Sequence, residues 1–263
     1  MKSNIIRQSN LKNLFDCPIK YRLSLTNKIE QSKPMTMGLI FENFVLGSKE
    51  DGSIDSELGR TTKQMRESIE LYASKVKPIF KNGEAYKKIS YKGEGYELTG
   101  EIDYFGEFEY QGEAYSGILD LKLTGSIHKL WGLGDENEEY QLKPWDGKTK
   151  KHEFLQSFMY PYIMMRNTGE IHNFYYLVVE SGTIENMKNN DPLIKLYDCT
   201  PTPSDFLWLE ERIGEALSIS DVDYLPPNKR HCIECQFFKN RSCKMGIDEF
   251  SKVRKINLSD LGE

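Results

Sequence analysis

One stretch of the sequence, residues 96–125, constrains the fold more than any other part of the chain. Its residues, YELTGEIDYFGEFEYQGEAYSGILDLKLTG, alternate between apolar and polar types, and Gly100, Gly106 and Gly112 punctuate the alternation. Alternation with a period of two is typical of half-buried strands, and glycines between such runs are typical of tight turns. The stretch therefore predicts three strands joined by tight turns.

Apolar residues with helical spacing occur on both sides of this stretch, in residues 9–23, 38–46, 61–80 and 152–167. Pro18 has to break or restart the first of these helices. Residues 173–180, NFYYLVVE, form a short and nearly uniformly apolar run, which favours a strand at the centre of a sheet. A further helix near the C-terminus completes an α/β fold in which helices flank a central mixed β-sheet.

Composition limits the classes of function. A chain of 263 residues with 38% apolar residues can bury an ordinary core, and we expect one domain over residues 1–263. The net charge of -5 provides no overall attraction to nucleic acid, so any polyanion has to be held by local basic patches. No apolar run reaches the roughly 20 residues of a membrane helix, and MKSNIIRQSN does not resemble a signal peptide. We expect a cytoplasmic protein that does not bind membranes.

Two charges interrupt an otherwise apolar strand in residues 117–125, GILDLKLTG. Asp120 and Lys122 leave the strand on one face, because residues two apart share a face, and the neighbouring leucines occupy the other. Taken alone, an Asp-x-Lys pair predicts a solvated salt bridge on a half-exposed strand. Other carboxylates nearby favour a second interpretation.

Two further carboxylates can lie near Asp120. Asp103 belongs to GEID, on the preceding strand, and Glu42 belongs to MGLIFENF, on an early helix that could pack beside the sheet. Three carboxylates completed by water form an oxygen site that suits Mg²⁺ or Mn²⁺. Lys122 could then reach an attacking water or a phosphate oxygen.

The helix after the charged strand contributes two polar side chains, Gln156 and Tyr160 in QSFMY. They are four residues apart and so lie on one face of the helix, and both can donate hydrogen bonds. For Tyr160 alone, the ordinary expectation is a buried ring with a satisfied hydroxyl.

Together, GEID, ILDLKLT and QSFMY resemble the G-x-x-D, D-x-K and Q-x-x-x-Y motifs of the RecB-like branch of the PD-(D/E)XK nucleases, in order, spacing and placement. The resemblance covers about residues 9–245 and implies a restriction-endonuclease-like core at about residues 35–180. It implies that Asp103 and Asp120 bind the metal, that Lys122 acts at the attacking water, and that Gln156 and Tyr160 position substrate or active-site groups. Many relatives carry a histidine four residues after the glycine of the early helix, where this chain has Glu42.

Five cysteines raise a second question about metals. Cys232, Cys235 and Cys243 have the spacing of a metal clip, and Cys17 supplies a fourth thiolate if the two ends of the chain meet. Spacing alone fits a zinc site as well as a [4Fe-4S] cluster, and free buried thiols are a further alternative. Cys199 is most simply a non-ligand.

The setting of Cys17 in CPIKY resembles iron-sulfur members of the RecB-like branch, including AddB-type helicase-nuclease subunits and CRISPR-adaptation exonucleases. That resemblance implies a [4Fe-4S] cluster held by one N-terminal and three C-terminal cysteines, with Zn²⁺ as the alternative. The cluster would join about residues 9–25 to residues 200–246.

Basic residues surround the C-terminal cysteines and alternate with Phe237 and Phe238, so they could bind phosphates while the rings stack on bases. They are Lys229, Arg230, Lys239, Arg241 and Lys244. Such a run is also what a solvated face looks like.

The sequence thus predicts a metal-dependent deoxyribonuclease that uses a metal-activated water and carries a structural iron-sulfur cluster. The resemblance implies an exonuclease acting on single-stranded DNA ends, with a possible helicase or recombination partner. The alternative is a catalytically weak or inactive nucleic-acid-binding or assembly module with the same fold. A structural protein built on a four-cysteine zinc site is a third hypothesis.

Overall fold

The computed structural model describes residues 4–27, 32–47, 63–127, 131, 154–181, 191–220, 225, 228, 232 and 235–244. The helices are α1 (Gln8–Asp16), α2 (Pro18–Thr26), α3 (Lys33–Leu46), α5 (Lys63–Val76), the 3₁₀ helix η1 (Lys77–Ile79), α7 (Gln156–Thr168), α9 (Pro203–Ser220) and α10 (Gln236–Lys239). The strands are β1 (Asn4–Arg7), β2 (Phe80–Gly93), β3 (Tyr96–Tyr110), β4 (Glu113–Thr124), β5 (Phe174–Glu180) and β6 (Leu193–Asp198).

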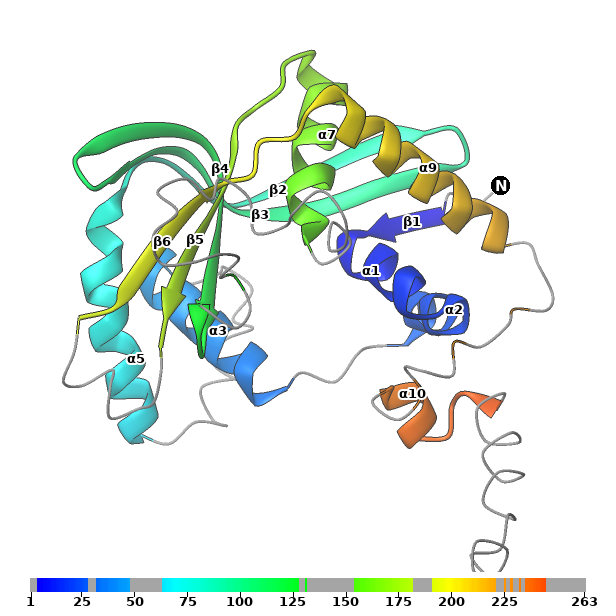
Figure 1. Cartoon of the computed structure of the whole chain (residues 1–263), viewed down its shortest axis with the longest axis horizontal. Helices are drawn as coiled ribbons and strands as arrows, with labels where there is room; N and C mark the ends of the chain where they lie inside the picture. The colour runs from blue at the N-terminus through cyan, green and yellow to red at the C-terminus, as the bar shows by residue number, and fades with distance from the viewer. Residues whose placement is uncertain are drawn as a thin grey trace, which may run out of the picture.

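The strands form one six-stranded mixed sheet in the order β1-β3-β4-β5-β6, and β2 pairs with β3 off this path (Figure 1). β1 runs parallel to β3 and β4 runs parallel to β5, whereas the β2–β3, β3–β4 and β5–β6 pairs are antiparallel. Helices flank the sheet, so the α/β fold with a central mixed sheet is confirmed.

The sheet divides next to Asp103 and Asp120, the two aspartates of the sequence motifs. The pairing of β3 with β4 ends at Tyr104 opposite Leu119, one position before Asp103 and Asp120 would face each other. From there β4 continues beside β5 as far as Thr124, whereas the first half of β3 continues between β1 and β2. Figure 1 shows the two sets of strands running apart from this point. From Asp120 onward, β4 therefore no longer pairs with β3.

The prediction of three strands within residues 96–125 is wrong, because this stretch forms only β3 and β4. Gly112 does lie in the turn between them, but Gly100 and Gly106 lie inside β3. A Cβ on Gly106 would collide with the backbone of Asn82 and Gly83 in β2. The absence of a side chain at this position permits close packing of two strands and does not mark a turn. The third long strand, β2, precedes the stretch.

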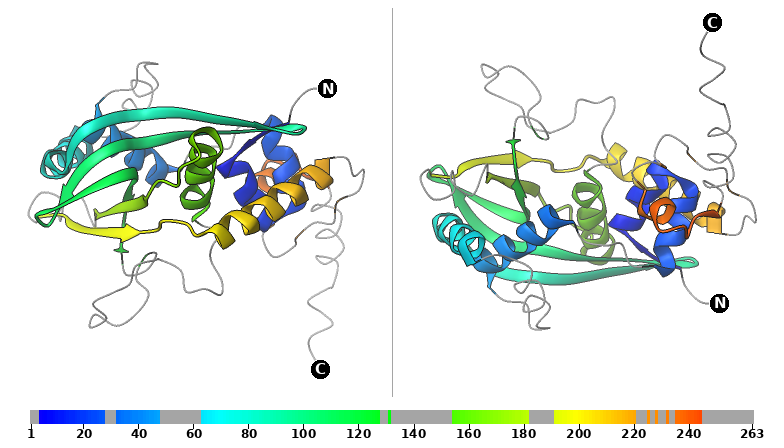
Figure 2. Two further views of the ribbon diagram at one scale, coloured as in Figure 1. Left: turned by 90° about the horizontal axis from the view of Figure 1, so that it is seen from above. Right: turned by 90° about the horizontal axis from the view of Figure 1, so that it is seen from below.

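Each face of the sheet has its own hydrophobic core. On one face, α1, α7 and α9 pack with residues such as Phe158, Tyr176 and Leu209. On the other face, α3 and α5 pack with residues such as Phe41 and Leu177. Figure 2 shows these two layers of helices from above and below. Neighbouring residues of β5 enter opposite cores, which explains why this strand is almost entirely apolar.

The N-terminal helices lie beside the C-terminal helix α10 (Figures 1 and 2). Cys17 is extended and separates α1 from α2, and Pro18 occupies the first position of α2, where its missing N–H costs nothing. The backbone N–H of Asn228 donates to Cys17 Sγ over 3.4 Å. Segments more than two hundred residues apart in sequence therefore meet here.

The helices in the described ranges are too short or too polar to cross a membrane.

Candidate functional site

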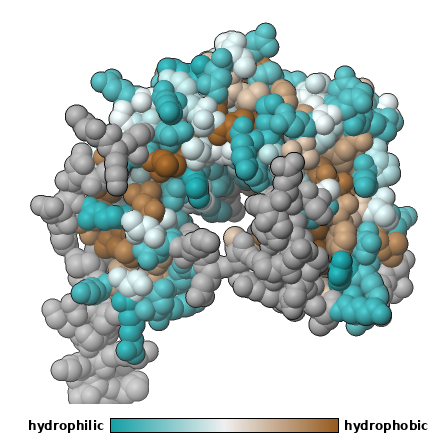
Figure 3. Space-filling view, turned by 180° about the vertical axis from the view of Figure 1, so that it is seen from behind, coloured by the Kyte–Doolittle hydropathy of each residue, from teal (hydrophilic) through white to brown (hydrophobic). Residues whose placement is uncertain are grey.

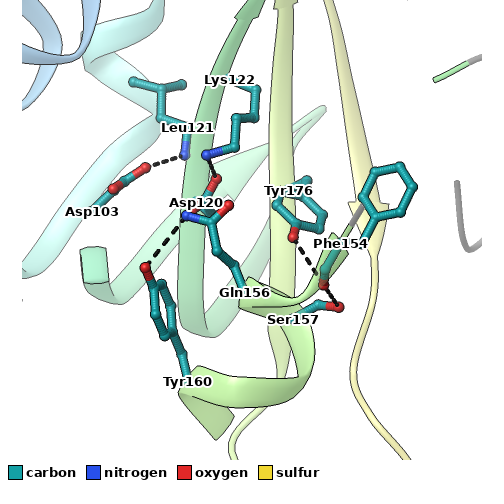
Figure 4. Close-up of polar contacts among 9 residues, drawn as sticks. All are labelled: Asp103, Asp120, Leu121, Lys122, Phe154, Gln156, Ser157, Tyr160 and Tyr176. Atoms are coloured by element: carbon teal, nitrogen blue, oxygen red, sulfur yellow. Dashed lines mark hydrogen bonds and ion pairs between the residues drawn. The ribbon is translucent and has the colours of Figure 1, made fainter. Parts of the chain in front are cut away.

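Asp103 and Asp120 lie on neighbouring strands where the sheet divides. Asp103 Oδ2 accepts a hydrogen bond of 2.9 Å from the backbone N–H of Leu121, so a side chain of β3 caps β4 where backbone pairing has ended (Figure 4). Asp120 is fully buried, and its carboxylate forms an ion pair with Lys122. As the sequence predicts, Asp120 and Lys122 share one face of β4, while Leu119 and Leu121 enter the core on the other face.

Burial and the charges of Asp103, Asp120 and Lys122 shift the pKa values of Asp120 and Lys122. Burial and repulsion from Asp103 raise the pKa of Asp120 to about 7, although Lys122 acts in the opposite direction. Burial lowers the pKa of Lys122, but the charges of Asp120 and Asp103 outweigh it, and the net shift is upward. Lys122 therefore stays protonated at neutral pH and serves as a hydrogen-bond donor and positive charge. Asp120 changes its protonation state near neutrality.

Gln156 and Tyr160, at the start of α7, face the two aspartates (Figure 4). Gln156 Nε2 donates to Tyr160 Oη over 3.4 Å. The pKa of Tyr160 is raised, first by burial and then by the charges of Asp120 and Asp103, while the contact with Gln156 lowers it. The hydroxyl is therefore neutral and available as a donor beside the carboxylates. All five motif residues from Asp103 to Tyr160 come together in one place.

Glu42 approaches from the α3 side of the sheet. It is buried, and α3 packs on both β4 and β3. The position of Glu42 relative to Asp103 is indicated by the hydroxyl of Tyr86. Burial raises the pKa of this hydroxyl, and the negative charges of Glu42 and then Asp103 raise it further. Both carboxylates therefore lie near the same hydroxyl.

Sequence reasoning did not find Tyr86. It lies in β2 at the position that the register places opposite Asp103, and its φ of 56° is a left-handed conformation that tyrosine rarely adopts. Its hydroxyl lies 3.0 Å from Gly47 O and 3.3 Å from Asn43 Oδ1, which joins β2 to the end of α3. No motif marks this residue, because its importance comes from long-range pairing.

The donor set of this site fits a hard divalent cation. Asp120 Oδ1 is buried and has no hydrogen-bond partner in the part of the chain that the structure describes, and Asp103 presents a second carboxylate one strand away. Carboxylate oxygens of this kind suit Mg²⁺ or Mn²⁺. As the side chains stand, no three histidine, cysteine or acidic residues of the described ranges converge to metal-binding distance.

The four cysteines expected to act together line one small cavity between α2 and α10. They are Cys17, Cys232, Cys235 and Cys243, and Leu23 and Phe237 contribute apolar walls. Cys17 and Cys232 both contact the backbone of Asn228. The N–H of Asn228 donates to Cys17 Sγ, and Cys232 Sγ donates to the carbonyl of Asn228 over 3.7 Å. Cys199 is buried in the core around α7 and α9 instead. Four cysteines around one apolar cavity fit a four-thiolate metal centre in residue type, although as the side chains stand they do not converge to metal-binding distance.

The expected basic patch is described in part. Lys239, Arg241 and Lys244 are exposed at α10 and just after it. Lys229 and Arg230 lie outside the described residues. Figure 3 shows the molecule hollowed between the part with α1 and α2 and the part with α3 and α5, and the coloured walls of the hollow are largely hydrophilic.

Comparison with solved structures finds a likeness of fold. A solved structure from Eubacterium rectale, described as a "putative exonuclease", superposes with a TM-score of 0.58 at 16% sequence identity, over 90% of this chain and 88% of that chain. No protein-family model matches the sequence, and no curated protein matches it either. At this identity the likeness shows a shared fold over nearly the whole chain.

Proposed function

We propose that this chain is a metal-dependent nuclease that hydrolyses phosphodiester bonds at the site formed by Asp103, Asp120 and Lys122. The observation that carries the proposal is the fully buried Asp120, paired with Lys122 and facing Asp103 where the sheet divides. Burying Asp120 beside the half-buried Asp103 raises the free energy of the folded state, and a bound cation would offset this cost. The exonuclease description of the structurally similar protein agrees with this activity.

In this proposal Asp103 and Asp120 hold Mg²⁺ or Mn²⁺, and Glu42 is a third ligand. Such an ion, when bound, lowers the pKa of water and neutralises charge on the phosphate. Lys122 is protonated, so it donates a hydrogen bond that orients the attacking water and stabilises negative charge on the phosphate. The water loses a proton to solvent as its oxygen bonds to phosphorus, the phosphorus–oxygen ester bond breaks, and the leaving oxygen takes a proton from solvent. Gln156 and Tyr160 donate hydrogen bonds to the substrate phosphate or the attacking water.

We further propose that Cys17, Cys232, Cys235 and Cys243 hold a [4Fe-4S] cluster, with one Zn²⁺ as the alternative. The shared cavity supports a centre of either kind, because all four cysteines line it. Its role is structural, since it would tie the N-terminal helix pair to the C-terminal segment.

The substrate class is the one that the resemblance of the sequence motifs implies. We propose DNA with a free single-stranded end, bound in part by Lys239, Arg241 and Lys244, whose side chains are exposed. In this proposal the strand passes through the hollow of Figure 3, whose coloured walls are largely hydrophilic.

The test is incubation of the pure protein with end-labelled single-stranded and double-stranded DNA, in Mg²⁺, Mn²⁺ or EDTA. We expect cleavage that requires the metal and is fastest on single strands. Lys122→Ala should abolish cleavage and change DNA affinity by only a few-fold, because Lys122 acts chiefly in the transition state.

Lys195→Ala is the matched control, since Lys195 is an exposed lysine on β6 and should leave cleavage unchanged. Metal-independent binding without cleavage by the wild type would favour the inactive binding module instead. Equal cleavage by the wild type and the Lys122 variant would reject the proposed mechanism.

A further inference from the structure

A cavity of about 560 Å³ lies beside the candidate active site, between the start of α1 and the neighbouring strands β2 and β3. Its volume is within the range of roughly 300–1,000 Å³ that is usual for ligand sites. A space of this size accommodates one nucleotide of a strand. Most of its lining residues are of polar types, including Ser9, Ser90 and Thr99.

The charged residues that line this cavity favour an anion. Arg7 and Lys88 contribute two cations, and neither forms an ion pair within the described ranges. Glu101 is the single carboxylate among the described lining residues. The first backbone N–H groups of α1, at Gln8 and Ser9, have no partner within their own helix and carry partial positive charge.

Tyr160 connects this cavity to the candidate active site. Its ring lies against Gly100 and lines the cavity, while the charges of Asp120 and Asp103 raise the pKa of its hydroxyl. One side chain therefore separates the carboxylates from the cations. A phosphodiester strand has one phosphate per nucleotide, so a strand cleaved at the carboxylates would place a neighbouring phosphate on the far side of Tyr160.

We infer that this cavity is a phosphate subsite, in which Arg7 and Lys88 hold the phosphate of the nucleotide next to the scissile bond of a single strand. The inference rests on the proposed function for its choice of ligand. It assigns binding to β1, α1 and β2, which none of the sequence motifs includes.

The experiment measures binding without cleavage. The affinity of the full-length protein for a short, fluorescently labelled single-stranded DNA is measured by anisotropy in EDTA, over a series of salt concentrations. The Arg7→Gln/Lys88→Gln double variant should bind roughly tenfold more weakly, and its salt dependence should fall by about 0.7 per lost phosphate contact. Lys195→Gln removes an exposed charge from β6 and should change neither quantity.

A neutral variant tests the cavity separately from the charge. Ser90→Ile narrows the cavity, suits a strand and leaves every charge in place, so it should weaken binding without changing the fold, as checked by circular dichroism. Affinity and salt dependence equal to the wild type in both the double variant and Ser90→Ile would overturn the inference.

A cleavage assay separates this inference from the proposed function. If the wild type cleaves DNA while the cavity variants bind it normally, the subsite is wrong and the nuclease proposal stands. If the wild type binds DNA through Arg7 and Lys88 but never cleaves it, the subsite stands and the nuclease proposal fails.

Discussion

The ring of Tyr160 occupies the space where any residue other than glycine at position 100 would place its side chain. A Cβ on Gly100 would lie 2.5 Å from Tyr160 Cε1 and 3.0 Å from Cδ1. The glycine of GEID therefore permits α7 to bring Tyr160 against β3, beside Asp103. This contact gives a physical reason for the pairing of the two motifs, which lie more than fifty residues apart in the sequence.

Gly100→Ala should displace Tyr160 and disturb the site. We expect a loss of about 1–3 kcal/mol in stability from overpacking. We also expect cleavage to fall roughly hundredfold, as small misplacements at active sites produce. Gly214→Ala is the control: Gly214 is exposed in α9 with open space around it, and alanine there should stabilise the helix by up to about 1 kcal/mol.

A double-mutant cycle isolates the contact. In a Tyr160→Ala background, Gly100→Ala should cost little stability, since the clashing ring is absent. The same cost in both backgrounds would show that Gly100 is required for another reason. Thermal or urea denaturation gives all four free energies of unfolding.

The raised pKa of Asp120 predicts how stability depends on pH. Burial and Asp103 raise the pKa of Asp120 to about 7 in the folded protein, from 3.8 when exposed. Between about pH 4 and pH 7 the unfolded state therefore releases this proton and the folded state retains it, so the contribution to stability falls as pH rises. Asp120→Asn removes this term. In EDTA, the stability of Asp120→Asn relative to the wild type should increase from pH 4 to pH 7.

The same titration affects catalysis in the opposite direction. An aspartate must be ionised to bind a metal ion, so cleavage should rise as pH increases toward 7 and beyond. Asp120→Asn should be inactive at every pH. A stability difference between the wild type and Asp120→Asn that does not change with pH would contradict the shift.

The four-cysteine cavity predicts the colour and composition of the protein. After anaerobic purification, a [4Fe-4S] cluster should give broad absorption near ~400 nm and about four irons per chain. Cys17→Ala and Cys235→Ala should lose the iron and destabilise the whole fold. Cys199→Ala is the control, because Cys199 is a buried cysteine that lies away from the cavity; it should retain the iron. A colourless protein that contains one zinc per chain would reject the iron-sulfur cluster and support the zinc site instead.

The motif residues could be grouped from the sequence because their positions follow from local rules. Spacing along β4 places Asp120 and Lys122 on one face, and spacing along α7 does the same for Gln156 and Tyr160. The sequence places Gly100 and Gly106 in turns, whereas both lie inside β3, because a turn and a close contact between strands both favour glycine. Only the tertiary structure distinguishes the two, through the position of β2 against Gly106.

Residues that depend on long-range pairing could not be found in this way. Tyr86, Arg7 and Lys88 carry no motif, and each gains its place from the pairing of β1 or β2 with β3. β1 and β6 are four and six residues long, too short for their alternation to stand out from the flanking sequence.

Tyr86 predicts a coupling between β2 and the carboxylate on α3. Tyr86→Phe removes the hydroxyl that contacts Gly47 and Asn43, which should cost about 1 kcal/mol per hydrogen bond. We expect weaker Mg²⁺ binding as well, because the neutral hydroxyl lies beside Glu42 and Asp103. Isothermal titration with Mg²⁺ measures this effect. Tyr110→Phe removes a comparable hydroxyl, bonded to Ile194 O, and should leave Mg²⁺ affinity unchanged.

Glu42 is the residue at which this sequence departs from the motif pattern that it otherwise resembles, and its substitution tests the proposed third ligand. Glu42→Gln keeps the shape and removes the charge, so it should weaken Mg²⁺ binding and slow cleavage, with partial rescue at high Mn²⁺. Glu42→His should stay active and shift its preference toward Mn²⁺, because imidazole suits the softer ion. Glu70→Gln, an exposed glutamate on α5, is the control. Wild-type cleavage and unchanged metal dependence in both Glu42 variants would leave Asp103 and Asp120 as the protein ligands.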